Sequence, residues 1–121
     1  MKNILIIDDN KDIVDLFKTI LESSGYACTT ATGGKAGIEQ LKSKQFDLTL
    51  LDLAMPEVSG LDVLEYVKKD PGLSKSAKIL IVTASSPTEA ETERIRRDYP
   101  ILDLIKKPIN KTKLLQTIDK Y

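Results

Sequence analysis

The sequence predicts an α/β fold in which helices cover both faces of a doubly wound parallel sheet. Short apolar runs alternate along the whole chain with stretches in which apolar residues recur at helical spacing. The apolar runs are continuous, which is typical of strands that are buried on both faces. Four of these runs end directly at polar residues. Because ligands bind outside the carboxyl ends of such strands, these polar residues are the candidates for function.

The composition is that of an ordinary globular chain. Its 121 residues suit one domain with a single core, and 30% of them are charged against 41% hydrophobic. The 18 basic and 18 acidic residues balance. The net charge therefore favours neither direct binding of nucleic acid nor binding of an acidic membrane surface.

The cysteine content and the N-terminal residues indicate in which cellular compartment the protein is expected. Cys28 is the only cysteine, so no internal disulfide can form, and we expect it to be a small core residue. No apolar run approaches the length of a membrane span, and Met1-Lys2-Asn3 leads into a strand rather than a signal peptide. A cytoplasmic protein is expected.

Five strands and five helices are expected in strict alternation. The expected strands span residues 3–7, 27–31, 48–51, 79–82 and 101–105. Asn10 is expected to cap the first helix, and Gly25 to end it. The run Ser86-Pro87-Thr88-Glu89 predicts a capping box for the fourth helix, and Asn110 is expected to cap the last one.

The third helix is expected after Gly60, with Leu61, Leu64 and Val67 on one face. Asp70-Pro71-Gly72 predicts a turn before the fourth strand. 

The fourth helix has few apolar residues that could pack on the core, and Ala90 and Ile95 are the clearest of them. Glu93 and Arg97 are four residues apart and can form an ion pair. Such a helix is either a solvated surface or a loosely held element that shifts in a switch.

Right-handed crossovers and the usual five-strand order predict the arrangement 2-1-3-4-5. The strands at 3–7 and 48–51 are then neighbours, at the point where the winding reverses. The side chains that follow the strands should converge on one edge of the sheet. They are Asp8, Asp9, Asp52, Thr83 and Lys107.

The three aspartates predict a metal site. Carboxylates this close repel one another unless a cation is present, and Mg²⁺ prefers oxygen ligands of this kind. No histidine or cysteine accompanies them, which disfavours zinc and copper. A single aspartate after a strand usually only caps the next helix, but the pair Asp8-Asp9 beside Asp52 favours metal binding.

Asp52 is the candidate nucleophile, because it stands alone after the central strand. Aspartate is known to attack phosphoryl groups and form an aspartyl-phosphate. Phosphoryl transfer also needs groups that offset the charge on the transferred oxygens, and the hydroxyl of Thr83 and the ammonium of Lys107 are suited to this. Lys107 precedes Pro108, which restricts its backbone.

Five stretches of sequence share a specific order and spacing: IIDD at 6–9, LLDLAMP at 50–56, GLDVL at 60–64, VTA at 82–84 and KP at 107–108. With them the chain resembles the receiver domain of two-component response regulators over essentially its whole length. The resemblance implies a flavodoxin-like (βα)5 fold and one receiver domain over residues 1–121, similar to stand-alone receivers of the chemotaxis or sporulation-relay type.

The resemblance also implies roles. Asp52 would accept a phosphoryl group from a phosphohistidine on a sensor histidine kinase or a histidine phosphotransfer protein. Asp9, Asp52 and the backbone carbonyl of Ala54 would ligate Mg²⁺, with Asp8 acting mainly through water. Thr83 would bond a phosphoryl oxygen. 

Lys107 would pair with the phosphoryl group. The domain would assist only its own phosphorylation and dephosphorylation and is therefore not expected to be an enzyme in the usual sense.

The fourth helix, the fifth strand and the fifth helix would form the output surface, which regulates a downstream protein or an output domain outside this chain. Any dimer is expected to use the same face. The chain departs from the family at Leu104, three residues before Lys107, where an aromatic switch residue is common.

Three other functions stay open at this point. A phosphatase of the haloacid-dehalogenase kind also uses an aspartyl nucleophile, but it needs an aspartate where Ala54 stands, and a cap domain. A flavodoxin-like cofactor binder would place a phosphate after the first strand, where Asp8-Asp9 would repel it. A receiver used as a phosphate-independent scaffold would not need the complete acidic set.

Overall fold

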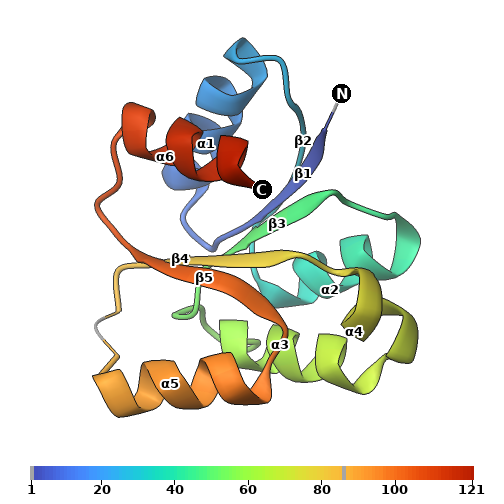
Figure 1. The fold of residues 1–121 in the computed structure, drawn as a ribbon. Helices are drawn as coiled ribbons and strands as arrows, with labels where there is room; N and C mark the ends of the chain where they lie inside the picture. The colour runs from blue at the N-terminus through green and yellow to red at the C-terminus, as the bar shows by residue number, and fades with distance from the viewer. Residues whose placement is uncertain (1, 86) are drawn as a thin grey trace.

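A computed structural model describes residues 2–85 and 87–121. Within these residues five parallel strands form one sheet in the order β2-β1-β3-β4-β5 (Figure 1). The strands are β1 Asn3–Ile7, β2 Ala27–Ala31, β3 Leu48–Leu51, β4 Ile79–Thr83 and β5 Ile101–Lys106. The fold class and strand order predicted from the sequence are confirmed. The last two strands each run one residue further than expected, to Thr83 and Lys106.

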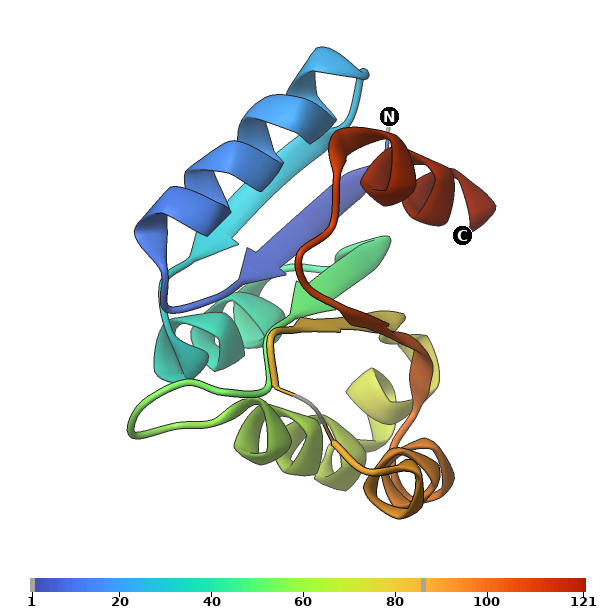
Figure 2. The same cartoon turned by 90° about the vertical axis from the view of Figure 1, so that its left-hand side faces the viewer.

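Six helices are described where five were expected. They are α1 Lys11–Ser23, α2 Gly34–Ser43, α3 Gly60–Lys69, α4 Pro71–Ser76, α5 Glu89–Asp98 and α6 Lys111–Lys120. Figures 1 and 2 show α1 and α6 on one face of the sheet, and α2, α3 and α5 on the other. None of the described helices combines the length and the apolar character that crossing a membrane requires.

The core lies in two layers because successive strand residues point to opposite faces. Ile4 and Ile6 pack in the layer under α1 and α6, and Leu5 and Ile7 pack in the layer under α2, α3 and α5. All four are at most 1% exposed. Full burial of an aliphatic side chain stabilises a fold by about 1.5–3 kcal/mol, so these strands hold the sheet edge rigidly in place.

The strand register brings the polar residues to one edge. Ile7 pairs with both Ala31 of β2 and Leu51 of β3, so the carboxyl ends of the three strands are level. The backbone N–H of Asp52 donates to the carbonyl of Ile7 at 3.0 Å, which continues the ladder by one residue. Asp8 and Asp52 therefore emerge side by side.

The expected caps of the first and last helices are formed. The side chain of Asn10 accepts from the backbone N–H groups of Asp12 and Ile13, and Asn110 accepts from that of Lys113. Gly25 follows the end of α1 with φ 93°, a conformation that glycine adopts without strain.

The turn expected at Asp70-Pro71-Gly72 is instead the start of α4. Asp70 is the N-cap, and its Oδ1 accepts from the backbone N–H of Leu73 at 3.0 Å. Pro71 occupies the first helical position, where its missing N–H costs nothing. Asp, Pro and Gly in this order are compatible with a turn and with the start of a helix. The hydrogen bond from Leu73 to the Asp70 side chain stabilises the helix.

The buried face of α3 was also assigned wrongly in part. Val63, Leu64 and Val67 are fully buried, whereas Leu61 is 37% exposed. The helix is rotated so that Gly60 and Val63 face the sheet, because the first turn packs tightly against the end of β3.

The start of α5 differs from the expected capping box. The N-cap is Thr88, whose hydroxyl accepts from the N–H of Glu91 while the Glu91 carboxylate accepts from the N–H of Thr88. The Ser86 of the expected box lies outside the described residues. 

The anchors of α5 are fewer than expected. Ala90 is exposed, and Ile95 is the buried residue of this helix. Arg97 contacts Asp98 at 3.4 Å instead of pairing with Glu93.

Candidate functional site

Three carboxylates gather where β1 and β3 end. One oxygen each of Asp8, Asp9 and Asp52 lies within 4.8 Å of the others. Asp8 is 3% exposed and Asp52 is 6% exposed, whereas Asp9 is open to solvent. The convergence expected from the strand order is therefore present, with two of the acids buried and one at the mouth of the site.

Asp52 is the most unusual of the three. Its Oδ1 is buried and has no hydrogen-bond partner among the described residues. Burial raises the pKa of Asp52 above its ordinary value, and the nearby Asp8 adds to this. The Lys107 ammonium, the Thr83 hydroxyl and the Ala54 backbone amide lower that pKa, but not enough to reverse the rise. A buried, unpartnered carboxylate oxygen indicates a site that another group completes.

Lys107 reaches the same cluster from the end of β5. Its Nζ lies 2.6 Å from Oδ2 of Asp8 and 4.0 Å from Oδ2 of Asp52. Its side chain is only 14% exposed. The backbone N–H of Lys107 donates to the Thr83 carbonyl at 2.8 Å, and the Lys107-Pro108 peptide bond is cis. The neighbouring Lys106 is exposed, so Lys107 is the lysine of the site.

Thr83 is the last residue of β4 and is fully buried. Its Oγ1 accepts from the backbone N–H of Ser85 at 3.2 Å. A hydroxyl can accept and donate at once, so the proton of Thr83 remains available for an acceptor beside Asp52.

Gly60 determines the path of the loop that follows Asp52. A Cβ at this position would lie 2.3 Å from the backbone oxygen of Asp52, so only glycine fits. The N–H of Gly60 donates to the carbonyl of Leu53 at 2.9 Å. These contacts fix the loop that carries Ala54, whose side chain is exposed. Sequence reasoning gave Gly60 only as the start of a helix and missed this role.

Asn10 is a second residue whose role at the site was missed. Its backbone N–H donates to Oδ1 of Asp8 at 3.0 Å, while its side chain caps α1. The signal was present in the sequence, because aspartate often accepts from the backbone two residues further on.

The donor set fits a hard divalent cation. It consists of carboxylate oxygens that follow two neighbouring strands, and one of them is buried without a partner among residues 2–85 and 87–121. Such a set suits Mg²⁺, which binds through one or two carboxylates and keeps several waters.

Comparison with known proteins identifies the family. The model of the response regulator receiver domain matches residues 4–119. The chain belongs to this family. 

A receiver domain of this kind is a regulatory, phospho-accepting domain of two-component signalling whose general function is a phosphorylation-activated switch. Members of the family interact with histidine kinases and downstream targets.

Individual relatives cover almost the whole chain. The receiver is 32% identical over 120 residues to the polar-differentiation response regulator DivK of Brucella anthropi, with 99% of this chain and 95% of the relative covered. It is 32% identical to the response regulator TrrA of Thermotoga maritima, solved in complex with Mg²⁺ and BeF, with TM-score 0.80 and coverage of 99% and 98%. The chemotaxis protein CheY4 of Vibrio cholerae has the same fold, with TM-score 0.88 and coverage of 99% and 98% at 23% identity.

Proposed function

We propose that this receiver accepts a phosphoryl group on Asp52 from a phosphohistidine of a sensor histidine kinase or a histidine phosphotransfer protein. The observation that carries the proposal is the buried Oδ1 of Asp52, which has no hydrogen-bond partner in the part of the chain that the structure describes, while Lys107 lies 4.0 Å from the other oxygen. A nucleophile that is desolvated and has a cation nearby is suited to attack an electron-poor phosphorus.

In the proposed transfer, a carboxylate oxygen of Asp52 forms a bond to phosphorus as the phosphorus–nitrogen bond of the phosphohistidine breaks. The electron pair of that bond leaves with the imidazole, and the product is an acyl phosphate. Lys107 exchanges Asp8 for a phosphoryl oxygen, which its flexible side chain permits. Thr83 donates its hydroxyl proton to another phosphoryl oxygen.

Asp8, Asp9, Asp52 and the backbone carbonyl of Ala54 would hold Mg²⁺. When bound, the ion offsets the negative charge that the phosphoryl oxygens bring into an acidic site. The cluster of oxygens within 4.8 Å supports this assignment. The relative TrrA, solved with Mg²⁺ and BeF, supports it independently.

An apolar hollow beside Lys107 supports a protein as the donor. Its volume is about 400 Å³, and its lining includes Ile13 and Leu16 of α1 with Pro108 and Ile109 after β5. Leu16 is 51% exposed and is one of two large hydrophobic side chains that are exposed among the described residues. An apolar surface next to a charged site indicates a protein partner that covers both.

The change would pass to the surface of α5, β5 and α6, which regulates a downstream protein or an output domain outside this chain. Thr83 pairs with Lys106 across β4 and β5, so a shift of Thr83 acts on β5 directly. The ion pair between Arg96 and Asp103, at 2.8 Å, then joins β5 to α5. We further propose that residues 1–121 act as one receiver domain, that any dimer uses this face, and that the exchange occurs in the cytoplasm.

The experiment uses phosphoramidate, a small donor with a phosphorus–nitrogen bond, together with Mg²⁺. The wild type should gain the mass of one phosphoryl group. Asp52→Asn should gain none, and the exposed control Asp15→Asn should react as the wild type does. Phosphorylation of Asp52→Asn at the wild-type rate would refute the proposal, and sustained hydrolysis of an added phosphate ester would favour a phosphatase.

A phosphorylated histidine phosphotransfer domain as donor tests the apolar hollow. Leu16→Ser should slow this transfer while leaving the reaction with phosphoramidate unchanged. Equal effects on the two donors would remove the hollow from the donor interface.

A further inference from the structure

Among the described residues, the contacts that hold α5 to the rest of the fold lie in its second half. Ile95 is 4% exposed and belongs to the core layer under α2, α3 and α5. Arg96 donates to Oδ1 of Asp103 on β5 at 2.8 Å. Tyr99 is the C-cap of the helix and packs against the same layer as Ile95. We call residues 95–99 the anchored end of α5.

The first half of α5 has no such contacts. Residues 89–94, which we call the exposed end, are open to solvent apart from Thr92, which is half-buried. The two hydrogen bonds of the capping box join Thr88 and Glu91, so they stay within the helix. In the part of the chain that the structure describes, no side-chain hydrogen bond or ion pair joins residues 89–94 to another element.

Tyr99 joins the anchored end to α3. Its hydroxyl donates to Oε1 of Glu65 at 2.6 Å, and the ammonium of Lys68 lies 5.3 Å from the centre of its ring. The hydrogen bond to Glu65, together with burial, raises the pKa of Tyr99 to about 12. The hydroxyl therefore keeps its proton near neutral pH and donates it to a carboxylate, and a hydrogen bond to a charged group is stronger than one between neutral groups.

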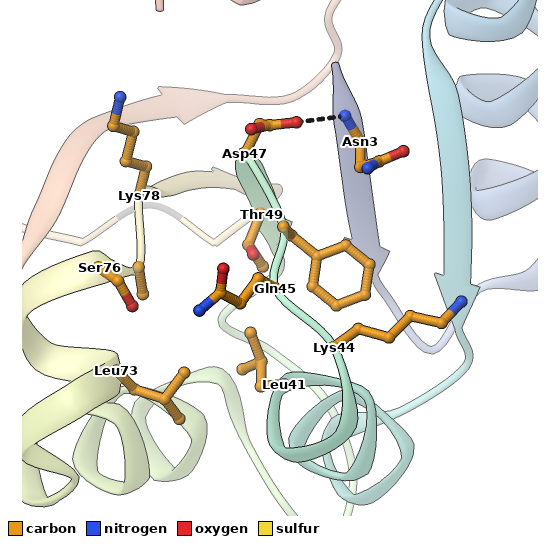
Figure 3. Close-up of a pocket in the computed structure, with 11 residues that line it drawn as sticks. Asn3, Leu41, Lys44, Gln45, Asp47, Thr49, Leu73, Ser76 and Lys78 are labelled. Atoms are coloured by element: carbon orange, nitrogen blue, oxygen red, sulfur yellow. Dashed lines mark hydrogen bonds between the residues drawn. The ribbon is translucent and has the colours of Figure 1, made fainter. Parts of the chain in front are cut away.

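The helix that accepts this bond is firmly packed. Val63, Leu64 and Val67 of α3 are fully buried. The short helix α4 follows α3 directly, and its Leu73 packs against the core layer that contains Leu41 of α2. Figure 3 shows Leu41 and Leu73 on two sides of one hollow, where β3 and β4 begin. Because α3 is fixed in this way, the bond from Tyr99 fixes the anchored end of α5.

The exposed end is also the end that follows β4 in the chain. Glu89 begins α5 six residues after Thr83, the last residue of β4. A movement that reaches α5, along the chain from Thr83 or through the packing of β5, therefore displaces the end with fewer contacts. The 10 residues of α5 span about 15 Å. A rotation of about 10° about the anchored end thus moves the first residue by about 2–3 Å and the last one hardly at all.

We propose that α5 moves as a lever about Tyr99. Phosphorylation of Asp52 displaces the exposed end, while the hydrogen bond between Tyr99 and Glu65 keeps the anchored end on α3. This inference rests on the proposed function, because phosphorylation drives the movement. A target that distinguishes the two states then contacts residues 89–94 rather than the C-terminal end of the helix.

The test adds beryllofluoride and Mg²⁺ to the ¹⁵N-labelled full chain and measures amide hydrogen exchange residue by residue. Exchange at residues 92–94 should change by at least about threefold, and exchange at residues 97–99 by less than about 1.5-fold. The ¹⁹F signals of bound beryllofluoride show separately that the acidic site is occupied.

The variants remove the bond that holds the anchored end. Tyr99→Phe keeps the ring and loses the hydroxyl, so beryllofluoride should now change exchange at residues 97–99 by at least about threefold as well. Glu65→Ala should have the same effect, whereas Glu65→Gln keeps an acceptor oxygen and should respond as the wild type does. Tyr66→Phe is the matched control. The ring of Tyr66 also lies under an ammonium group, that of Lys42, but its hydroxyl forms no hydrogen bond among the described residues.

Two results obtained with the site occupied would overturn the lever. One is an equal change at both ends of α5 in the wild type. The other is a response of Tyr99→Phe that stays confined to the exposed end. Absence of the ¹⁹F signals of bound beryllofluoride would instead refute the proposed function, and the lever with it.

Discussion

At the scale of single residues, the acidic cluster is a source of instability as long as no cation is bound. Asp8 and Asp52 are almost fully buried, and of the described residues Lys107 is the cation within 4.0 Å of both. One positive charge faces three negative ones, whose oxygens lie within 4.8 Å of one another. Removal of one carboxylate should therefore stabilise the metal-free protein.

We predict that Asp9→Asn raises the free energy of unfolding by about 1 kcal/mol in buffer without divalent cations. The substitution removes the negative charge that repels the carboxylates of Asp8 and Asp52. Urea unfolding with and without Mg²⁺ measures this. Mg²⁺ should stabilise the wild type and have a much smaller effect on the variant. A loss of stability in Asp9→Asn without metal would contradict the account of the cluster.

Cys28 lies partly buried on β2, against the layer under α1 and α6. Burial raises the pKa of the thiol to about 11, and the charge of Glu22 contributes. At pH 8 only about one molecule in a thousand then carries a thiolate, so the thiol should react about 100-fold more slowly than in the unfolded chain. Reaction with a disulfide reagent, with and without denaturant, measures the ratio. Equal rates would show that the thiol is exposed.

At the scale of elements, tight packing of α3 on the end of β3 determines the shape of the loop after Asp52. We predict that Gly60→Ala costs about 3 kcal/mol or more, because its Cβ would meet the Asp52 backbone oxygen at 2.3 Å. Gly72→Ala is the matched control, since its Cβ would meet its nearest neighbour at 3.4 Å. Chemical denaturation of the two variants compares them, and equal stabilities would show that the loop is not held by this contact.

The sequence predicted elements well where one local signal dominates. Four of the five strands follow from short, mainly apolar runs, and the start of α1 follows from Asn10 as a cap. It failed where two signals compete. Asp70-Pro71-Gly72 is compatible with a turn or a capped helix, and Ser86 and Thr88 are both plausible caps for the same helix.

The sequence predicted where the candidate site lies, but not which aspartate lies nearer to Lys107. Strand order places Asp8 and Asp52 at one edge, because parallel strands end together. The choice of Asp8 over Asp52 as the nearer partner of Lys107 depends on how the chain leaves β5, which no local pattern encodes. The tight fit at Gly60 is likewise a contact between segments and became visible only in the structure.

At the scale of the whole molecule, α5 is a helix held to the rest of the fold by few buried side chains. Ile95 is its buried residue, and the ion pair between Arg96 and Asp103 joins it to β5. Leu104, where the family often has an aromatic switch residue, packs only partly buried against the layer under α5. A change at Thr83 would therefore reach α5 through the packing of β5 and not through rotation of an aromatic ring.

We predict that beryllofluoride with Mg²⁺ changes amide hydrogen exchange in α5 by at least about threefold, while the central strand β3 stays protected. Mass spectrometry of peptides covering α5 and β3 measures both. Asp52→Asn is the control and should show no change. Unaltered exchange in α5 of the wild type would exclude this helix from the response.

The most direct test of the central claim is to locate the phosphoryl group. The protein is treated with acetyl phosphate and Mg²⁺, reduced with borohydride, and digested for peptide sequencing by mass spectrometry. Reduction of an aspartyl-phosphate yields homoserine, and we predict homoserine at position 52. Homoserine at position 8 or 9, or none anywhere in a folded and Mg²⁺-bound protein, would contradict the account.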